Sequence, residues 1–281
     1  MALPDPVSLQ SDLEAIRSSS PNAAPYVDRA IAALQSPARP GLGGPANPPD
    51  VSTDELAALI DHTELHPDAT DADVDQVLNE ALQHGFASVC IAPSQVPRAA
   101  NTLADSGVAV CTVVGFPHGA NRSSTKAHEA HLAVIDGARE LDMVLDIGAI
   151  KSGRYADVEA DIRAVVEAGQ DAADKVGVDV KVKVILETAL LTEAEKALAC
   201  VLAQRAGANF VKTSTGFASG GATVEDVALM RQMVGSDLGV KASGGVGTAA
   251  DARRMVAHGA TRLGASGSVG IMESHAADSP A

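Results

Sequence analysis

The segments NFVKTSTG (Asn209–Gly216) and GVKASGG (Gly239–Gly245) decide the fold class of this 281-residue chain. Each begins with a short apolar run that contains one lysine, and each ends in small residues that are typical of tight turns. A stretch with helical spacing separates them. The two segments are therefore expected to be parallel strands that are joined by a helix.

The same alternation of strand and helix recurs from Val51 onward, with helix-period segments such as DADVDQVLNEALQHG (71–85) and TAADARRMVAHG (248–259). The other strand candidates are AALIDHTEL (57–65), FASVCIAP (86–93), VAVCTVVGF (108–116), LDMVLDIG (141–148), VKVKVILET (180–188) and RLGASGS (262–268). Eight strand–helix units predict an α/β fold, a closed (β/α)₈ TIM barrel over residues 51–281. An open doubly wound sheet is the alternative, but the GxGxxG loop that often follows its first strand is absent.

Residues 1–50 differ in character from the rest of the chain. Apolar residues recur there at helical spacing in two stretches, Leu9, Leu13 and Ile16 in the first, and Val27, Ile31 and Leu34 in the second. The segment PARPGLGGPANPPD (37–50) is rich in proline and glycine, which is typical of a linker. We expect an N-terminal helical extension without chemistry of its own.

The composition narrows the functional classes. Hydrophobic residues make up 46% and aromatic residues 2% of the chain, which suits small aliphatic strands that are buried on both faces. The formal net charge of −15 disfavours nucleic acid and anionic membranes as partners. A phosphorylated small molecule stays compatible with this charge, because backbone amides and helix N-termini can bind phosphate.

The sequence also indicates where the protein works. It contains no apolar run of about 18 residues and no basic segment followed by an apolar one at the N-terminus, so we expect neither a membrane span nor a signal peptide. Cys90, Cys111 and Cys200 form no CxxC pair, which indicates buried thiols in a reducing compartment. We therefore expect a cytoplasmic protein.

Lysines are concentrated in the predicted strands. Of the eight lysines in the chain, four lie in or at the ends of apolar strands, namely Lys181, Lys183, Lys212 and Lys241. Lysine is rarely buried unless it is paired or functional, and burial favours the neutral amine that attacks a carbonyl. Lys212 and Lys241 belong to consecutive strands, where mutual repulsion helps one of them to lose its proton. The alternative is that each lysine extends to the barrel rim and pairs with a carboxylate.

Asp142 lies in a strand that is otherwise apolar, where a carboxylate is costly unless it has a partner. It could move protons to and from a substrate hydroxyl or a water molecule. The alternative is a structural ion pair with one of the strand lysines. Asp146, four residues along the same segment, is a competing candidate. His62 follows Asp61 on the first strand and is expected near the pocket, without a defined role.

Small residues follow the late strands in STG (214–216), SGGVG (243–247) and GASGS (264–268). Such turns let backbone N–H groups approach an anion, and barrel enzymes often bind phosphate at the loops after strands seven and eight. The alternative is that the glycines only form tight turns. The eight histidines show no HExxH or similar spacing, so no metal site is expected.

With these residues assembled, the chain resembles the deoxyribose-phosphate aldolase family, from about Leu59 to about Gly270. The motifs that carry the resemblance are IDHT (60–63), SVCIAP (88–93), VVGFPHGAN (113–121), DMVLDIG (142–148), KVILET (183–188), FVKTSTGF (210–217), VKASGGV (240–246) and RLGASG (262–267). The resemblance implies a class I, Schiff-base aldolase that needs no cofactor. Its substrate would be 2-deoxy-D-ribose 5-phosphate, cleaved to D-glyceraldehyde 3-phosphate and acetaldehyde.

The resemblance also implies roles for individual residues. The family's imine-forming lysine corresponds to Lys212, and the second lysine, which helps the first to lose its proton, corresponds to Lys241. The proton-transfer aspartate corresponds to Asp142. The phosphate-binding elements correspond to Gly216, Gly244, Gly245, Gly264 and Ser266. Lys183 matches a strand lysine that is not the nucleophile, and Phe217 stands where some members have lysine.

Two other functions stay open as alternatives. The first is a class I aldolase that acts on a different phosphorylated sugar. The second is a non-catalytic barrel that binds sugar phosphates, which the presence of both Lys212 and Asp142 disfavours. A homodimer or a higher oligomer is compatible with the sequence.

Overall fold

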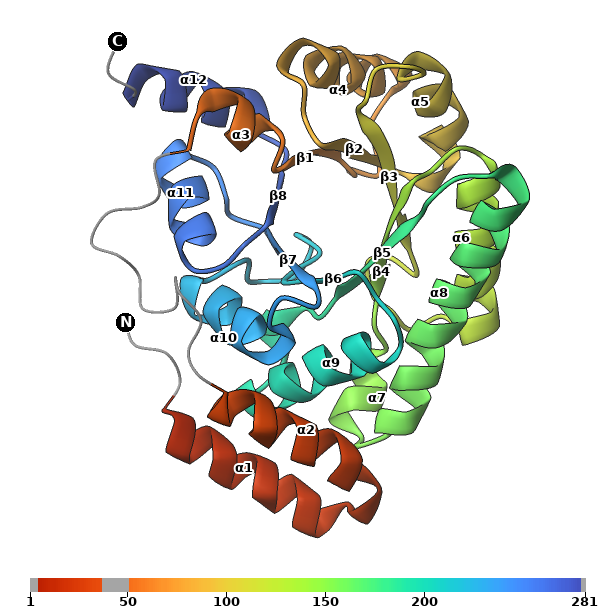
Figure 1. Ribbon diagram of the computed structural model, residues 1–281. Helices are drawn as coiled ribbons and strands as arrows, with labels where there is room; N and C mark the ends of the chain where they lie inside the picture. Colours follow the sequence, from red (N-terminus) through yellow and green to blue (C-terminus); the bar gives the residue numbers. More distant parts are fainter. Residues whose placement is uncertain (1–4, 37–50, 279–281) are drawn as a thin grey trace.

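Eight parallel strands close into a barrel in the computed structural model, which describes residues 5–36 and 51–278 (Figure 1). Neighbours in the barrel are also neighbours in the chain, and β8 pairs with β1. The strands are β1 (Ile60–Glu64), β2 (Ser88–Ile91), β3 (Ala109–Val114), β4 (Glu140–Val144), β5 (Lys181–Ile185), β6 (Phe210–Lys212), β7 (Gly239–Ser243) and β8 (Arg262–Ala265). The predicted TIM barrel is confirmed. Seven of the eight predicted segments contain a whole strand, and β4 begins one residue before the predicted segment 141–148.

Helices surround the strands on the outside of the barrel (Figure 1). The helices are α3 (Thr53–Ala57), α4 (Asp71–His84), α5 (Val96–Thr102), α6 (Ser123–Ile135), α7 (Ile147–Lys151), α8 (Tyr155–Val176), α9 (Glu193–Arg205), α10 (Val224–Val234), α11 (Ala249–Ala257) and α12 (Ser268–Asp278), with 3₁₀ turns η2 (Pro93–Gln95) and η3 (Thr188–Leu190). Helices α4, α9 and α11 begin after Thr70, Thr192 and Thr248, whose hydroxyls accept from a backbone N–H in the first turn. These caps satisfy donors that a helix start leaves free, so the sequence marks where each helix begins.

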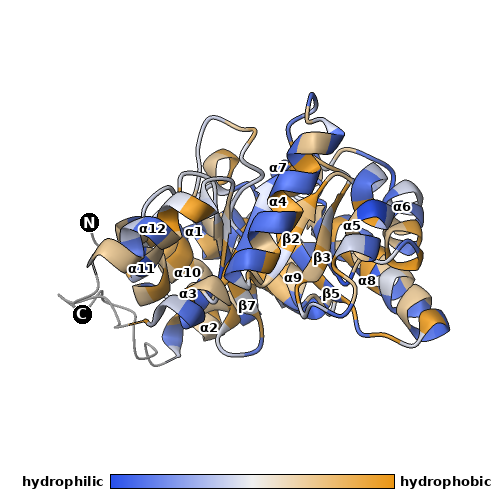
Figure 2. Ribbon diagram, turned by 90° about the horizontal axis from the view of Figure 1, so that it is seen from above, coloured by the Kyte–Doolittle hydropathy of each residue, from blue (hydrophilic) through white to orange (hydrophobic). Residues whose placement is uncertain are grey.

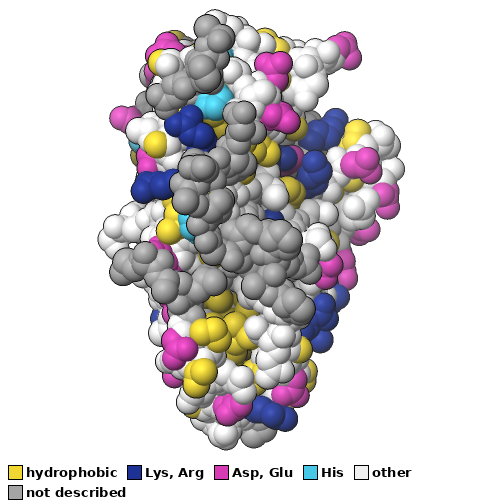
Figure 3. All heavy atoms as spheres, turned by 60° about the vertical axis from the view of Figure 1, so that its left-hand side comes forward, with side chains coloured by type: hydrophobic (Ala, Val, Ile, Leu, Met, Phe, Trp, Pro, Cys, Tyr) yellow, Lys and Arg dark blue, Asp and Glu magenta, His cyan; other side chains and the backbone are white. Residues whose placement is uncertain are grey.

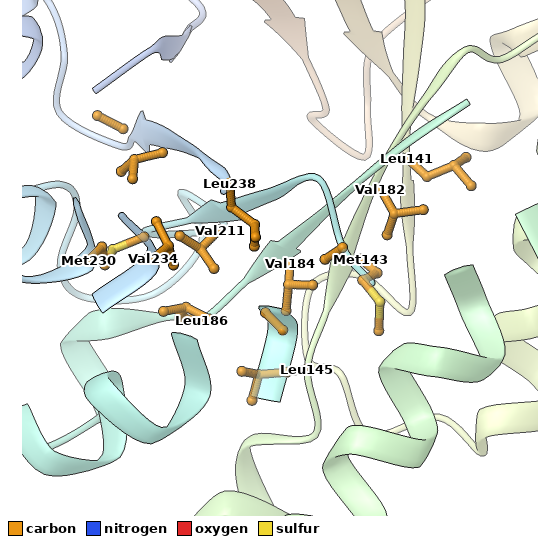
Figure 4. Close-up of a cluster of buried hydrophobic side chains, with 14 of the residues drawn as sticks. Leu141, Met143, Leu145, Val182, Val184, Leu186, Val211, Met230, Val234 and Leu238 are labelled. Carbon is orange, nitrogen blue, oxygen red and sulfur yellow. The ribbon is translucent and has the colours of Figure 1, made fainter. Parts of the chain in front are cut away.

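Strand β4 shows how alternation places the site. Leu141 and Met143 belong to the buried apolar cluster between the strands and the helices, together with Val182 and Val184 of β5 (Figure 4). Successive side chains of a strand point to opposite faces, so Asp142 between them points into the barrel. Figure 2 shows the same division in hydropathy, with hydrophobic residues on the strands and hydrophilic ones on the outer faces of helices.

The N-terminal extension is a pair of helices, α1 (Pro6–Ser19) and α2 (Ala24–Gln35), joined by η1 (Pro21–Ala23). Figure 1 shows this pair against α9 and α10, and its buried Leu13 and Val27 join the apolar core of the barrel. The guanidinium carbon of Arg205 lies 5.2 Å from the ring centre of Tyr26. The two predicted N-terminal helices are thus confirmed. The predicted linker over 37–50 lies outside the described residues.

Charges of both signs are interspersed on the face that Figure 3 presents. Within the described residues, no helix has the length and apolar character that crossing a membrane requires. Cys90, Cys111 and Cys200 are buried free thiols.

Candidate active site

The barrel interior holds seven charged side chains that are at most 8% exposed, and we call this set the interior ion network. Its members are Asp61 of β1, Glu140 and Asp142 of β4, Lys183 of β5, Lys212 of β6, Lys241 of β7 and Arg262 of β8. Buried charges are costly unless they are paired. With four basic and three acidic members, one positive charge is unbalanced when all are ionised.

Asp142 lies at the centre of this network. Its Oδ2 accepts from Lys212 Nζ at 2.8 Å and from Lys241 Nζ at 2.7 Å, and its Oδ1 accepts from Lys183 Nζ at 2.8 Å. Burial raises the pKa of Asp142, but the positive charges of the three lysines outweigh it and hold the pKa well below its ordinary value. The structure therefore brings the three predicted catalytic residues together. It also shows the ion pairing that was the alternative for Asp142.

Burial was expected to favour the neutral form of a lysine, but the pKa values of Lys241 and Lys183 go the other way. Burial lowers the pKa of Lys241, but the negative charges of Asp142 and Asp61 outweigh it and raise the pKa above its ordinary value. The pKa of Lys183 is likewise raised, because the charges of Asp142 and Asp61 overcome its burial. That expectation was wrong for these two lysines, which stay ammonium ions at neutral pH.

Arg262 closes the network at its deep end. Its Nη1 donates to Asp61 Oδ1 at 2.6 Å and to Glu140 Oε2 at 2.7 Å, while Lys183 Nζ lies 2.6 Å from Glu140 Oε2. Asp61, Glu140 and Arg262 were not among the residues predicted for the site. Their signal was available, because Glu140 and Asp142 are charged residues two positions apart in one strand and so share a face.

Lys212 and Lys241 face each other in register across β6 and β7, which confirms that the two lysines lie on neighbouring strands. Only Lys212 lines the large cavity at the carboxyl end of the barrel, which has a volume of about 510 Å³. The other lining residues are Thr63, Leu65, His66, Thr215, Gly216, Phe217, Ser243, Gly244, Gly245, Val246, Gly264, Ala265 and Ser266. Among the lysines of the interior ion network, Lys212 is thus the one that a substrate in this cavity can reach.

All five residues of the predicted phosphate site line this cavity, namely Gly216, Gly244, Gly245, Gly264 and Ser266. Within the described part of the chain, the backbone N–H groups of Gly216, Gly244, Gly245 and Ser266 donate to no other group. Unpaired amides that converge on one cavity are suited to bind an anion. Gly216, Gly244 and Gly245 have φ values of 89°, 82° and 79°, which favour glycine.

Gly264 has a different reason to be glycine. A Cβ atom there would lie 2.9 Å from Lys241 Cε and 3.0 Å from Ser243 Cβ. The lack of a side chain makes room for Lys241, so this position shapes the lysine site as well as the cavity wall.

Three charged or polar candidates have side chains that do not line the cavity. His62 precedes Thr63, which lines the cavity, but its own side chain is buried and its Nε2 lies 2.6 Å from Glu80 Oε2 of α4. Asp146 lies beyond β4 and caps α7, where its Oδ1 accepts from Ala149 N at 2.9 Å. Lys181 begins β5, and its side chain is 51% exposed. Lys181 Nζ lies 3.7 Å from Glu140 Oε1, so this exposed lysine touches the interior ion network from outside.

Comparison with known proteins places the chain in a family. The model of DeoC/LacD family aldolases matches residues 56–274, which span the whole barrel. The chain belongs to this family. It is therefore an aldolase, which is a carbon–carbon lyase.

Relatives support this assignment along the length of the barrel. The deoxyribose-phosphate aldolase of Clostridium perfringens strain SM101 is 55% identical over 225 residues, which are 80% of this chain and 97% of the relative. That of Staphylococcus carnosus is 54% identical and covers 80% of this chain and 99% of the relative. The resemblance to the deoxyribose-phosphate aldolase family is thus confirmed.

Solved structures agree with the fold. The structure of the deoxyribose phosphate aldolase from Aeropyrum pernix, described as a unique tetramer, is 32% identical with a TM-score of 0.74, covering 80% of this chain and 92% of that one. A structure from Coccidioides immitis is 38% identical with a TM-score of 0.79, covering 95% of this chain and 98% of that one. Because the latter match covers 95% of this chain, it includes part of the N-terminal extension.

Proposed function

We propose that this aldolase cleaves 2-deoxy-D-ribose 5-phosphate reversibly to D-glyceraldehyde 3-phosphate and acetaldehyde through an imine on Lys212. The relatives that are 54–55% identical over four fifths of the chain carry the name deoxyribose-phosphate aldolase. One observation carries the proposed chemistry. Lys212 alone among the lysines of the interior ion network lines the cavity, and its Nζ lies 2.8 Å from the Asp142 carboxylate.

The first step joins the substrate to the enzyme. The neutral amine of Lys212 attacks the aldehyde carbon C1 of the open-chain sugar, and water leaves as the imine forms. The unbalanced positive charge of the interior ion network favours loss of the proton from one lysine. Lys241 and Lys183 keep their protons because carboxylates raise their pKa values, and Lys212 is the lysine with access to the cavity.

The second step breaks the carbon–carbon bond. As the C3 hydroxyl loses its proton, the electrons of the C2–C3 bond move into the protonated imine, and glyceraldehyde 3-phosphate leaves. The remaining enamine gains a proton at C2, and water then releases acetaldehyde and restores Lys212. Asp142 is the carboxylate that contacts Lys212, so we assign it to proton transfer with a water molecule.

The phosphate binds in this proposal to the backbone amides of Gly216, Gly244, Gly245 and Ser266. Gly264 completes the wall between them and Lys241. The support is that these four residues line the same cavity as Lys212 and that their N–H groups are unpaired in the described part of the chain. Backbone donors carry no net charge, so this site is compatible with the acidic composition of the chain.

Trapping with borohydride tests the nucleophile. Borohydride reduces an imine to a stable secondary amine, so incubation with acetaldehyde should leave a two-carbon adduct that peptide mapping locates on Lys212. Lys212→Leu is the control and should give no adduct. An adduct on Lys183 or Lys241 in the unaltered protein would contradict the assignment of Lys212 as the nucleophile.

Two further properties complete the proposal. We propose that the chain forms a homodimer or a higher oligomer, since its Aeropyrum relative is described as a tetramer, and light scattering in solution measures this. We also propose a cytoplasmic location, which the three buried free thiols support. Cell fractionation with a specific antibody tests it.

A further inference from the structure

Glu187 has an unusual conformation at the mouth of the barrel. It follows β5, has a φ of 56° and is only 2% exposed. A non-glycine residue in the left-handed region is strained, and such residues cluster at functional sites. The surrounding structure must therefore hold Glu187 in place.

The side chain of Glu187 contacts one residue of the cavity wall. Its Oε2 accepts a short hydrogen bond from Thr215 Oγ1, and Thr215 N donates to the same oxygen at 3.3 Å. Phe217 N in turn donates to Thr215 Oγ1 at 3.1 Å. Both donors of Thr215 and the N–H of Phe217 are thus engaged, and only the N–H of Gly216 between them is unpaired in the described part of the chain.

The backbone around Glu187 holds the same segment from the other side. Leu186 N donates to Lys212 O at 2.9 Å, and Thr188 N donates to Thr213 O at 3.0 Å. The left-handed turn at Glu187 lies between these two bonds. It directs the side chain toward Thr215 while the flanking amides bind the strand that carries Lys212.

We propose that Glu187 is a positioning residue for the phosphate group of the substrate. Its carboxylate orients Thr215 so that the N–H of Gly216 is available to the phosphate. The second oxygen, Oε1, is buried without a hydrogen-bond partner among the described residues. Leaving a buried carboxylate oxygen unpaired is costly, which argues against a role in stability alone. This inference rests on the proposed function, because it concerns the same cavity.

Glu187→Gly is the most direct test. Glycine suits the left-handed conformation, so the change removes the carboxylate without adding backbone strain. We expect the KM for 2-deoxyribose 5-phosphate to rise about tenfold, with a smaller change in kcat, since a hydrogen bond to a charged group is lost. The KM for unphosphorylated 2-deoxyribose should rise much less. Inorganic phosphate should also inhibit cleavage of 2-deoxyribose more weakly than in the unaltered enzyme.

Two companion variants separate positioning from stability. Thr215→Val removes the donor hydroxyl and should reproduce the rise in KM, and combining it with Glu187→Gly should add little, because both remove one interaction. Glu187→Gln keeps an oxygen that accepts from Thr215 and should restore part of the affinity. Asp226→Asn is the matched control, because Asp226 is a buried carboxylate with a buried lysine partner, Lys196, away from the cavity.

The outcomes are distinct. Equal effects of Glu187→Gly on both sugars, or an unchanged KM for the phosphorylated sugar, would overturn the positioning role. A phosphate-specific rise in KM for the Asp226→Asn control would overturn it too. Failure of the unaltered protein to cleave 2-deoxyribose 5-phosphate would instead overturn the proposed function.

Discussion

Lys212 and Lys241 are partners in register on adjacent strands, yet only Lys212 lines the cavity. Their two ammonium nitrogens lie 2.8 and 2.7 Å from the same oxygen of Asp142. Two cations that share one carboxylate oxygen repel each other, so loss of a proton from one of them relieves the repulsion. The geometry thus divides two chemically identical side chains into one that lines the cavity and one that is a buried cation.

Replacement of Lys241 tests this division. Lys241→Leu removes the buried cation, and we expect the acidic limb of the kcat/KM profile, which reports the free enzyme, to move to higher pH. The reason is that Lys212 would give up its proton less readily without the neighbouring charge. The measurement is the pH dependence of kcat/KM for 2-deoxyribose 5-phosphate, together with borohydride trapping at alkaline pH.

The control for this experiment is Lys212→Leu, which should show no recovery at any pH because no imine can form. A Lys241→Leu profile that is low and flat over the whole pH range would contradict the tuning role. Lys241 would then transfer a proton directly, and its role and that of Asp142 would have to be reassigned.

Ser266→Asp tests the phosphate site. Ser266 lines the cavity, and its backbone N–H has no partner in the described chain, so a carboxylate there would repel the phosphate dianion. We expect an increase of about tenfold or more in KM for 2-deoxyribose 5-phosphate, which corresponds to roughly 1.4 kcal/mol. Steady-state kinetics with both sugars measure the effect. An equal increase for unphosphorylated 2-deoxyribose would indicate that this turn only shapes the barrel rim.

Catalysis should survive removal of metal ions. Two buried sets of potential metal ligands occur among the described residues, and they share Cys111. Their carboxylates already pair with Lys183, Lys241 and Arg262, so a metal ion would meet cations there. Turnover after extensive dialysis against EDTA should equal that of the untreated enzyme. Loss of activity that a divalent ion restores would contradict the imine mechanism.

The strands and the principal site residues could be predicted because their signals are local. A lysine or an aspartate in an apolar run is visible in the sequence, as Lys212, Lys241 and Asp142 show. Parallel strands also bring their carboxyl ends to one edge, so the small-residue turns had to meet. These inferences need only the order of strands around a barrel.

The site residues that could not be predicted depend on which face of the strand each side chain occupies. Strands that are buried on both faces lack the polar alternation that would distinguish inside from outside. Asp61 and His62 are adjacent, yet Asp61 enters the interior ion network and His62 points to Glu80. Closure of the barrel also joins Arg262 to Asp61, which lie 201 positions apart. The left-handed conformation of Glu187 has no sequence signal, because glutamate rarely adopts it.

Lys183 and Lys181 lie two positions apart on β5 and offer a matched pair for stability. Lys183 is fully buried and pairs with Asp142, Asp61 and Glu140, whereas the side chain of Lys181 is 51% exposed and only approaches Glu140 Oε1, at 3.7 Å. Lys183→Met would remove three buried ion pairs at once, and we expect a loss of about 3–5 kcal/mol in the free energy of unfolding. Lys181→Met should change it by less than about 0.5 kcal/mol. Denaturant unfolding of both variants measures the difference.

The difference in the free energy of unfolding between these two variants should be independent of pH between about pH 4 and 10. The pKa of Lys183 is raised in the folded protein, because the charges of Asp142 and Asp61 outweigh its burial. Its stabilising effect is therefore fully present below about pH 10.4, the unfolded value, and is lost as pH rises through the folded value. Burial raises the pKa of Asp142, but the lysine charges outweigh it and lower the pKa. The contribution of Asp142 to the free energy of unfolding is therefore present above about pH 3.9 and is lost as pH falls through the folded value. Unfolding measured between pH 4 and 10 should thus show a constant gap between the variants. A gap that grows toward either extreme would mean that other charges control the stability of the barrel.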